Sequence, residues 1–401
     1  MSSPLSSHWL LDSEVVYLNH GSFGACPKAV LAHQEMLRFR MEREPIRFLF
    51  RDIEPLLDAA RGGLSGFLGC APDDLALITN ATMGMNSVLR SLRFEPGDEL
   101  LVTDHEYNAS RNILEFMASR DQARVVVASV PFPPPSPEAV VDAILDRVTD
   151  RTRIALVDHV TSQTGLVLPI AEIVAYLAGR GVDTLVDGAH APGMLPLELD
   201  TIGAAYYTGN CHKWMCAPKG SAFLHVRSDK QEQIRPTSIS HGANSTRRDR
   251  SRFLIEFDWP GTFDPTGVLS IPAALEFIGS LSERGWPGVR EHNHRLALEG
   301  AKAVAERAGL SFTTPEEMIG SLVSFKLPPA RRPSAPGSSV AVLPIDPLQD
   351  AFMERARIEV PILYWPDASQ RMLRFSAALY NDISEYELLG DTLSELLAEG
   401  Y

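Results

Sequence analysis

The sequence predicts an α/β protein with a mainly parallel central sheet covered by helices and a smaller α+β domain at the C-terminal end. Short apolar runs of strand length alternate with amphipathic helical segments between residues 73 and 226. Such alternation is typical of a parallel sheet whose two faces are covered by helices. With 401 residues, 45% of them hydrophobic, the chain is long enough for one large domain and a smaller one.

The predicted elements follow one another in a regular order. We expect an N-terminal segment over residues 1–25, a large domain over 26–264 and a small domain over 265–401. Apolar residues at helical spacing predict a helix from Pro27 to about Phe50, and a second helix spans 54–67. Strands are predicted at 73–78, 99–103, 124–130, 154–158, 184–187, 204–207 and 221–226, with helices at 109–119, 137–148 and 169–178.

The pattern changes after residue 228. A polar loop over 240–250 precedes the small domain, whose first predicted helix spans 271–282. A stretch rich in Pro and Ser, 328–339, separates predicted strands at 321–327 and 340–344, so a surface loop is expected there. Ser384 and Glu387 have the spacing of a capping box before a final helix.

Composition and charge exclude several classes of protein. The net charge of −14 argues against a nucleic-acid partner. No stretch approaches the roughly 18 apolar residues of a membrane span, and the first residues lack the features of a secretory signal, so we expect a cytoplasmic protein. The four cysteines are too few and scattered for a disulfide framework. No metal site is predicted, because Cys211 and Cys216 form no CxxC pair and His105-Glu106 lacks the second His of HExxH.

Lys213 is the residue that most needs a chemical explanation. It follows a strand-like run, and apolar and aromatic neighbours such as Trp214 favour desolvation of its amine. Desolvation or a nearby positive charge lowers a lysine pKa from about 10.4 and creates a nucleophile. Asp187 ends the preceding strand-like run. A carboxylate and a lysine so placed suit pyridoxal phosphate, which needs a lysine for a Schiff base and an acid at its pyridine nitrogen. The alternative is a solvated lysine in a surface turn.

Two motifs resemble the class V aminotransferase group of pyridoxal phosphate enzymes, and especially isopenicillin N epimerase-like proteins. They are Val186-Asp187-Gly188-Ala189-His190 and Asn210-Cys211-His212-Lys213-Trp214. Further similarity at Tyr17-Leu18-Asn19-His20-Gly21 and Leu373-Arg374-Phe375-Ser376 extends the resemblance over nearly the whole chain. It implies a fold-type I enzyme with pyridoxal 5'-phosphate as cofactor. It selects no substrate, because the group includes cysteine desulfurases, kynureninases, C-S lyases and epimerases.

The resemblance implies roles for individual residues around the cofactor. Lys213 would hold the cofactor and then serve as the base that removes the α-proton, while Asp187 would pair with the pyridine nitrogen. His190 would lie near the ring phenolate, and Ser162 stands where cysteine desulfurases have an Asn. The phosphate ligands would be Ala81, Thr82, Asn210 and His212, with Thr262 reaching across from the neighbouring subunit of a homodimer. The turn at Ala81 and Thr82 is equally compatible with an ordinary helix N-cap by Asn80 or Thr82.

Other residues would contact the substrate and the outer face of the cofactor ring. Arg374 matches the arginine that holds the substrate α-carboxylate, and Asn19 and His20 are assigned to the same substrate site. Tyr107 falls where cysteine desulfurases stack a His on the ring, which leaves His105 as a structural residue. We therefore favour Tyr107 over His105 as the stacking side chain.

Three hypotheses of function follow. The first is cleavage of the C-S bond of a cysteine-derived L-α-amino acid through a Cα carbanion. The second is epimerisation at Cα, with Lys213 and Tyr107 as proton donors on opposite faces. The third is a non-catalytic protein that binds the cofactor. Persulfide formation on a small-domain cysteine is not expected, because the chain has no cysteine after Cys216.

Overall fold

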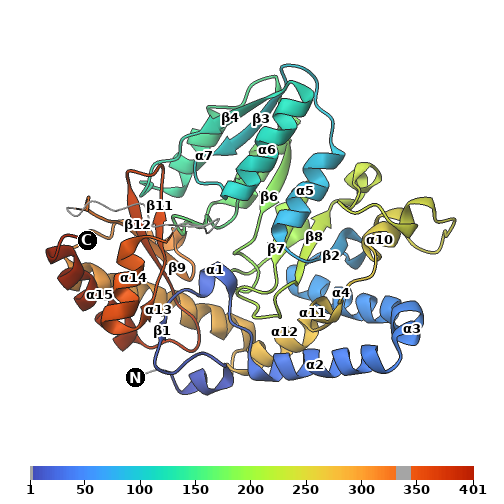
Figure 1. Cartoon of the computed structure of the whole chain (residues 1–401). Coiled ribbons are helices and arrows are strands. Elements are labelled where there is room, and N and C mark those ends of the chain that lie inside the picture. The colour runs from blue at the N-terminus through green and yellow to red at the C-terminus, as the bar shows by residue number, and fades with distance from the viewer. Residues whose placement is uncertain (1–2, 331–344) are drawn as a thin grey trace.

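The computed structural model describes residues 3–330 and 345–401. Within them, a seven-stranded sheet has the order β2-β8-β7-β6-β5-β3-β4, and β8 is the strand that runs antiparallel to its neighbours (Figure 1). The mainly parallel sheet predicted from the sequence is therefore confirmed. Its strands are Leu75–Ile78 (β2), Glu99–Thr103 (β3), Arg124–Ala128 (β4), Thr152–Asp158 (β5), Asp183–Asp187 (β6), Tyr206–Asn210 (β7) and Ala222–Val226 (β8).

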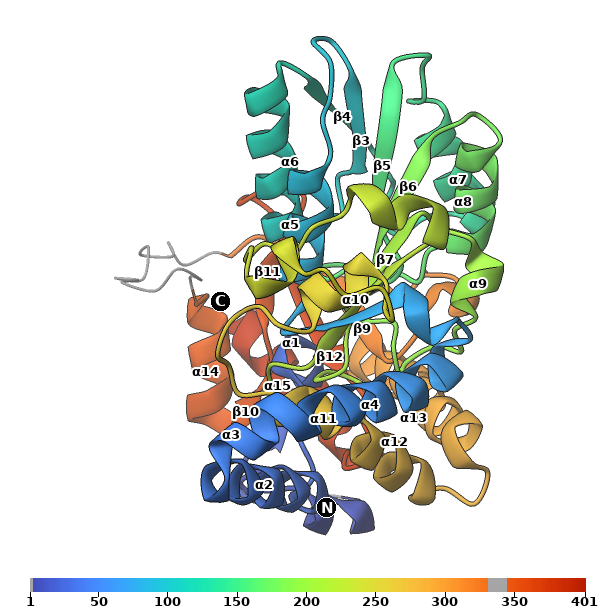
Figure 2. The ribbon, with the colours of Figure 1, turned by 90° about the vertical axis from the view of Figure 1, so that its right-hand side faces the viewer.

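Helices cover both faces of this sheet (Figure 2). Successive strand residues point to opposite faces, so Leu101 joins one core while Leu100 and Val102 join the other. The strands are consequently apolar on both sides, which explains why they were recognisable as continuous apolar runs. The first face is covered by Ile53–Leu68 (α4), Pro137–Leu145 (α7) and Ile170–Ala178 (α8), and the second by Ala81–Ser91 (α5), Asn108–Asp121 (α6) and Arg252–Phe257 (α10).

A smaller antiparallel sheet with its own core forms the C-terminal part, with the order β11-β12-β9. The strands are Leu322–Lys326 (β9), Ile362–Tyr364 (β11) and Arg371–Ser376 (β12), and the helices are Gly285–Ala308 (α13), Pro347–Ala356 (α14) and Ile383–Ala398 (α15). The N-terminal strand Val16–Tyr17 (β1) pairs in parallel with Ile358–Glu359 (β10). The N-terminal segment thus lies against the small domain, and Asn19 and His20 follow directly after this strand.

The remaining helices lie beneath the large sheet and in the connections. Thr266–Leu269 (α11) and Ile271–Ser280 (α12) pack on Lys28–Arg43 (α2) and on α4, so their apolar residues belong to the core of the large domain. The domain limits at residues 26 and 265 stay a proposal. The other short elements are Pro4–His8, His20–Phe23 (α1), Pro45–Arg47 (α3), Phe48–Asp52, Pro72–Asp74, Leu199–Ile202 (α9), Ser228–Gln233, His241–Asn244 and Glu316–Met318.

Two local predictions need correction. The helix predicted from Pro27 to Phe50 ends at Arg43, and a short helix and a π-helical turn follow it. The capping box consists of Asp382 and Glu385, two residues earlier than predicted, so the assignment to Ser384 and Glu387 was wrong. The predicted strand at 340–344 lies outside the described residues. Among the described helices, none is long and apolar enough to span a membrane.

Candidate active site

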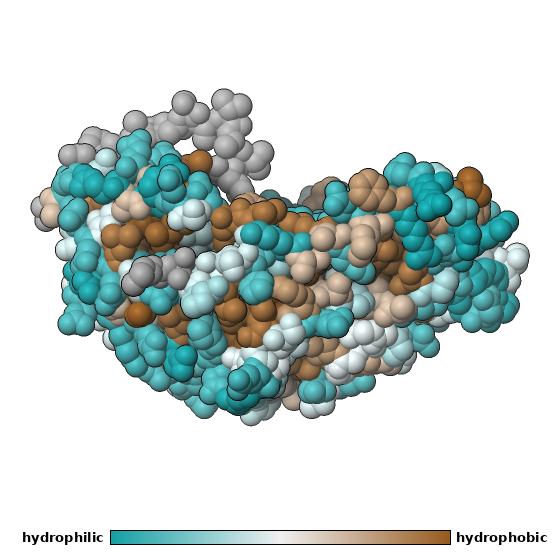
Figure 3. Space-filling model, turned by 90° about the horizontal axis from the view of Figure 1, so that it is seen from below, coloured by the Kyte–Doolittle hydropathy of each residue, from teal (hydrophilic) through white to brown (hydrophobic). Residues whose placement is uncertain are grey.

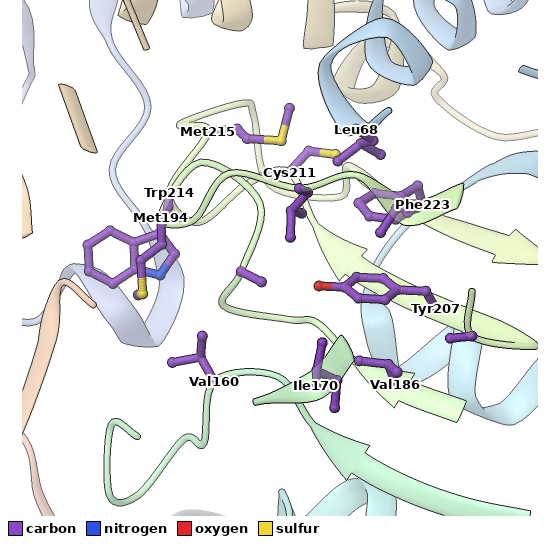
Figure 4. Packing of buried hydrophobic residues seen from close by; sticks show 14 of the residues in the cluster. Leu68, Val160, Ile170, Val186, Met194, Tyr207, Cys211, Trp214, Met215 and Phe223 are labelled. Carbon is purple, nitrogen blue, oxygen red and sulfur yellow. The ribbon is translucent and has the colours of Figure 1, made fainter. Parts of the chain in front are cut away.

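The loop that carries Lys213 starts where β7 ends, at the carboxyl edge of the parallel strands. Cys211, Trp214 and Met215 of this loop are buried in the core of the large domain (Figure 4). The backbone N–H groups of Cys211 and His212 both donate to the carbonyl oxygen of Ser221, at 3.0 and 3.2 Å. These hydrogen bonds fix the loop before Lys213, and the buried Trp214 and Met215 anchor it after Lys213.

The environment of Lys213 suits a nucleophilic amine. Its Nζ lies 2.9 Å from Nε2 of His190. Burial, followed by the positive charge of Arg374, lowers the pKa of Lys213 to about 7, although Asp187 and Asp158 oppose the shift. A large fraction of the side chain is then the neutral amine near neutral pH, in contrast to a lysine in water.

Two carboxyl groups lie side by side at the ends of β5 and β6, where Asp158 and Asp187 are register partners. Asp187 accepts hydrogen bonds from Ser110 Oγ and from the N–H of Ala189, each at 3.0 Å. Asp158 is buried, and its Oδ1 has no hydrogen-bond partner. Burial, and then the charge of Asp187, raises the pKa of Asp158 well above its usual value. Burial also raises the pKa of Asp187, but its hydrogen bonds and Lys213 oppose this, so Asp187 is the group that keeps the negative charge.

His190 is held as a neutral imidazole beside the lysine. Its Nδ1 accepts a hydrogen bond from Nε1 of Trp214 at 3.4 Å, which places the ring proton on Nε2, the atom that faces Lys213. Burial, with a further contribution from the charge of Lys213, lowers the pKa of His190 well below its ordinary value. His190 thus donates to a neutral Lys213 amine and orients it.

Arg374 is a buried cation, 3% exposed, on strand β12. Its Nη1 donates to the carbonyl oxygen of Ser162 at 2.6 Å and approaches Ser162 Oγ at 3.3 Å, and its Nη2 donates to Ser22 Oγ at 2.9 Å. These oxygens are all neutral, and no carboxylate of the described residues forms an ion pair with Arg374. Burial lowers the pKa of Arg374 to about 10, which still leaves it charged. A buried guanidinium without an acidic partner is suited to an anionic ligand.

Asn19 and His20 lie beside this site, but their polar atoms are engaged within the protein. The Nδ2 of Asn19 donates to Glu359 Oε1 at 3.2 Å, and its Oδ1 accepts from Ser22 Oγ at 2.6 Å. His20 bonds through Nδ1 to the Tyr380 hydroxyl at 2.7 Å and through Nε2 to the carbonyl oxygen of Lys213 at 3.0 Å. Both residues therefore hold site elements in place, and their contact with substrate stays a prediction.

The structure distinguishes Tyr107 from His105. His105 is buried, and its ring nitrogens bond to Thr164 Oγ1 at 2.7 Å and to the carbonyl oxygen of Val130 at 2.9 Å. Tyr107 is 43% exposed at the N-cap of α6, the helix that also supplies Ser110, and it lies near enough to Arg374 to affect its pKa. This arrangement favours Tyr107 as the residue that faces the site.

The predicted phosphate ligands are only partly brought together. Asn80 caps α5 by accepting from the N–H of Met83, and the N–H of Ala81 donates to Oδ1 of Asn210 at 2.9 Å. Thr82 is exposed in the first turn of the same helix. The ordinary N-cap interpretation is therefore satisfied, while Asn210 and the helix N-terminus remain adjacent.

The two other predicted phosphate ligands, His212 and Thr262, are not joined to Ala81 and Asn210 by hydrogen bonds. His212 donates through Nδ1 to the carbonyl oxygen of Ser221 at 3.0 Å, so its neutral ring has no N–H left for a phosphate. Burial lowers the pKa of His212 to about 4, and a bound phosphate dianion would favour its protonation. Thr262 is exposed, and no hydrogen bond joins it to the residues above. The contribution of Thr262 to the site of a neighbouring subunit therefore stays a prediction.

The residues present fit pyridoxal phosphate. Lys213 supplies an amine of lowered pKa, Asp187 supplies a charged carboxylate, and the buried Oδ1 of Asp158 has unused hydrogen-bonding capacity in the same place. Sequence patterns did not single out Ser22, Ser110 or Asp158 as site residues. The only sequence feature that indicated Asp158 was its position at the end of an apolar run next to the Asp187 strand.

Comparison with known proteins decides the family. The model of the family described as aminotransferase class-V matches residues 49–334. The chain belongs to this family. Isopenicillin N epimerase of Streptomyces clavuligerus is 34% identical over 403 residues, covering 97% of each chain. The corresponding protein of Amycolatopsis lactamdurans is 36% identical over 400 residues, covering 96% of each chain.

A second group of relatives has a different name. An L-cysteine desulfhydrase of Arabidopsis thaliana is 27% identical over 414 residues, covering 96% of this chain and 88% of that protein. Among solved structures, a cystine C-S lyase in complex with cysteine persulfide aligns with a TM-score of 0.79 at 22% identity, covering 96% of this chain and 98% of that one. At this identity the structural match shows the shared fold, and the class-V family membership rests on the sequence comparisons.

The lowered pKa of Lys213 predicts how cofactor attachment depends on pH. When cofactor-free protein is mixed with pyridoxal phosphate, the rate of covalent attachment should rise as pH increases through about 7, because the neutral amine then forms. The measurement is borohydride trapping followed by peptide mapping of Lys213. The Arg374→Gln variant should shift this rise to higher pH, since the neighbouring positive charge is removed. A rise that begins only near the usual lysine value of about 10.4 would contradict the prediction.

Proposed function

We propose that the chain is a pyridoxal-phosphate-dependent enzyme that cleaves the C-S bond of a cysteine-derived L-α-amino acid. The observation that carries the proposal is the proximity of two cations with different tasks. Lys213 has a lowered pKa that suits a nucleophile and base, and the charge of Arg374, which has no acidic partner, contributes to that lowering. An amine for the cofactor next to a binding site for a carboxylate is what an amino-acid substrate requires.

Each side chain has a task that follows from its geometry. Bound pyridoxal phosphate would supply an electron-accepting ring that stabilises negative charge at Cα. Lys213 Nζ, oriented by His190, removes the α-proton. Asp187, whose carboxylate accepts from Ser110 and from the N–H of Ala189, would hold the pyridine nitrogen of a bound cofactor protonated.

Arg374 decides the orientation of the substrate. Ser22 and Ser162 fix its guanidinium, so a bound α-carboxylate would be held in one direction. Fixing the carboxylate also fixes which bond at Cα faces Lys213. Loss of the β-sulfur as a thiol then needs no further nucleophile, which agrees with a chain that has no cysteine after Cys216.

Epimerisation at Cα is the second candidate, and Tyr107 is the observation that favours it. Its phenol is partly exposed at the site, near Arg374, and would supply a proton from the face opposite Lys213. The relatives named isopenicillin N epimerase also support this candidate. A protein that binds the cofactor without catalysis would have no need of an unpaired buried Arg374 or of a lysine with a lowered pKa.

Product analysis tests the proposal. Purified protein loaded with pyridoxal phosphate is incubated with L-cysteine, L-cystine, cysteine conjugates and a panel of L-amino acids. Pyruvate and a sulfur product should accumulate from at least one sulfur substrate, and the Lys213→Ala variant serves as the inactive control. Formation of D-isomers without pyruvate would replace the lyase proposal with the epimerase. Absence of turnover and of α-proton exchange on all substrates would contradict both.

Replacing Arg374 should remove discrimination for the α-carboxylate. One charged, two-pronged contact contributes about 1.5–3 kcal/mol, so Arg374→Ala should weaken binding of an amino-acid substrate roughly 10–150-fold. Binding of cysteamine, which lacks the carboxylate, should change little. The measurement is the ratio of kcat/KM for L-cysteine and cysteamine in the wild type and the variant, with the cofactor spectrum as a control for the intact site. An unchanged ratio would show that another residue binds the carboxylate.

We also propose that the protein is a homodimer whose subunits share their active sites. Thr262 is exposed, and it follows Gly261, whose φ of 114° is a backbone conformation that favours glycine. Large apolar side chains are exposed on α2, α3 and the turn that follows, namely Met36, Phe39, Ile46 and Phe50. Seen from below, apolar surface gathers in the middle of the molecule between hydrophilic ends (Figure 3). Burial of such surface in a second subunit would supply a driving force for association.

Hybrid dimers test whether Thr262 acts across the interface. Lys213→Ala and Thr262→Val chains carrying different affinity tags are co-expressed, and the mixed dimer is isolated with both tags. If Thr262 completes the neighbouring site, one site of the hybrid contains neither substitution, and about half of the wild-type activity per dimer should return. If Thr262 acts within its own chain, the hybrid should be no more active per intact lysine than the Thr262→Val homodimer. A monomer in light scattering would also contradict the proposal.

Location and partners complete the proposal. The four cysteines are free thiols and three of them are buried, which agrees with a reducing, cytoplasmic compartment. The net charge of −14 favours no nucleic-acid partner. The ligands of the proposed active site are the cofactor and a small amino acid.

A further inference from the structure

Three side chains that are far apart in the sequence meet at the edge of the large sheet away from Lys213. One ligand-type atom of each of Asp74, Asp200 and His225 lies within 4.8 Å of those of the other two. Asp74 ends the turn before β2, Asp200 lies in α9, and His225 lies near the end of β8. Figure 2 shows α9 at the border of the large domain.

The cluster lies at the opposite end of the strands from the proposed active site. His225 pairs with Tyr207 near the start of β7, whereas the Lys213 loop leaves the other end of that strand, after Asn210. Lys213, Asp187 and Arg374 therefore take no part in the cluster. Its chemistry needs a separate explanation.

His225 is the side chain that indicates a missing ligand. It is 3% exposed, and neither of its ring nitrogens has a hydrogen-bond partner. A buried imidazole with both nitrogens unsatisfied is costly, and native proteins pair such groups with protein, water or an ion. Its Nε2 points towards Oδ1 of Asp200 at 3.8 Å, too far for a hydrogen bond but suitable for an atom placed between them.

The two carboxylates leave coordinating oxygens on the same side. Asp74 uses Oδ1 to accept from Nε2 of Gln231 at 2.6 Å, which anchors the carboxylate and leaves Oδ2. The N–H of Asp200 donates to the carbonyl oxygen of Gly69 at 3.1 Å, so its backbone is fixed, while its side chain is 61% exposed and able to turn towards His225. The surroundings are acidic. Burial and the negative charges of Asp200, Asp73 and Asp229 raise the pKa of Asp74. Asp229 also accepts a hydrogen bond from the nearby Arg227.

We propose that Asp74, Asp200 and His225 bind a divalent transition-metal ion, of which Zn²⁺ and Mn²⁺ are examples. One imidazole nitrogen and two carboxylate oxygens are ligands of the type that such ions accept. Metal–ligand bonds of about 2.0–2.2 Å require the ligand atoms to move closer than 4.8 Å, and the exposed Asp200 side chain is the one that moves. The ion would join the turn before the edge strand β2, the strand β8 and the short helix α9, so its role is to stabilise this edge of the sheet.

Metal content and affinity test the site. The holoprotein is stripped with EDTA, dialysed against Zn²⁺, and assayed for metal per chain and for affinity. The wild type should bind one ion at this site. Asp200→Asn and His225→Gln should bind it at least about 10-fold more weakly, since loss even of an outer partner of a metal ligand has that effect. Asp73→Asn, which removes the same charge from the neighbouring residue, should bind like the wild type.

The comparison among variants separates this site from chelation by the cofactor, which all variants retain. Zn²⁺ should also raise the thermal midpoint of the wild type and of Asp73→Asn but not that of Asp200→Asn, a substitution at an exposed side chain that leaves the fold intact. Equal binding by all four proteins would overturn the proposal. Absence of stoichiometric binding by the wild type would overturn it as well.

Discussion

The burial of two positive charges within reach of each other is the constraint on which the site depends. Arg374 comes from strand β12 of the C-terminal sheet and Lys213 from the loop after β7, and the charge of Arg374 makes the charged form of Lys213 less favourable. Arginine stays protonated in almost any environment, whereas lysine gives up its proton readily. Lys213 is therefore the residue that loses its proton, and it becomes a neutral amine near neutral pH. The small domain thus contributes to the chemistry of the large one through the position of a single guanidinium.

Several parts of the chain hold that guanidinium in place. The N-terminal segment reaches the small domain through the pairing of β1 with β10, and the Ser22 hydroxyl that follows accepts from Arg374. Asn19 fixes Ser22, and the turn after β5 presents the carbonyl oxygen of Ser162. The position of Arg374 thus depends on contacts between residues more than 200 positions apart in the sequence.

The sequence was sufficient for the sheet and for the family, whereas the roles of the site residues stay predictions. The strands are buried on both faces, so they are continuous apolar runs, and the carboxyl ends of parallel strands place Asp158 and Asp187 together. Other features depended on contacts that no local pattern encodes. The capping box was misplaced because Asp382–Glu385 and Ser384–Glu387 have the same spacing, and only the course of the chain selects the first pair. Ser22, Ser110 and the cluster around His225 are assembled by tertiary packing alone.

The coupled carboxyl groups of Asp158 and Asp187 explain how one negative charge is confined to one position. Two adjacent buried carboxylates do not both ionise easily, so the proton resides on the group with fewer donors. Asp187 has Ser110 and the N–H of Ala189, while Asp158 Oδ1 has none. The protonated Asp158 then prevents a second negative charge from accumulating beside Lys213, which would raise the lysine pKa again. Burial and the charge of Arg374 lower the pKa of Lys213, and an uncharged Asp158 opposes that lowering less than a charged one would.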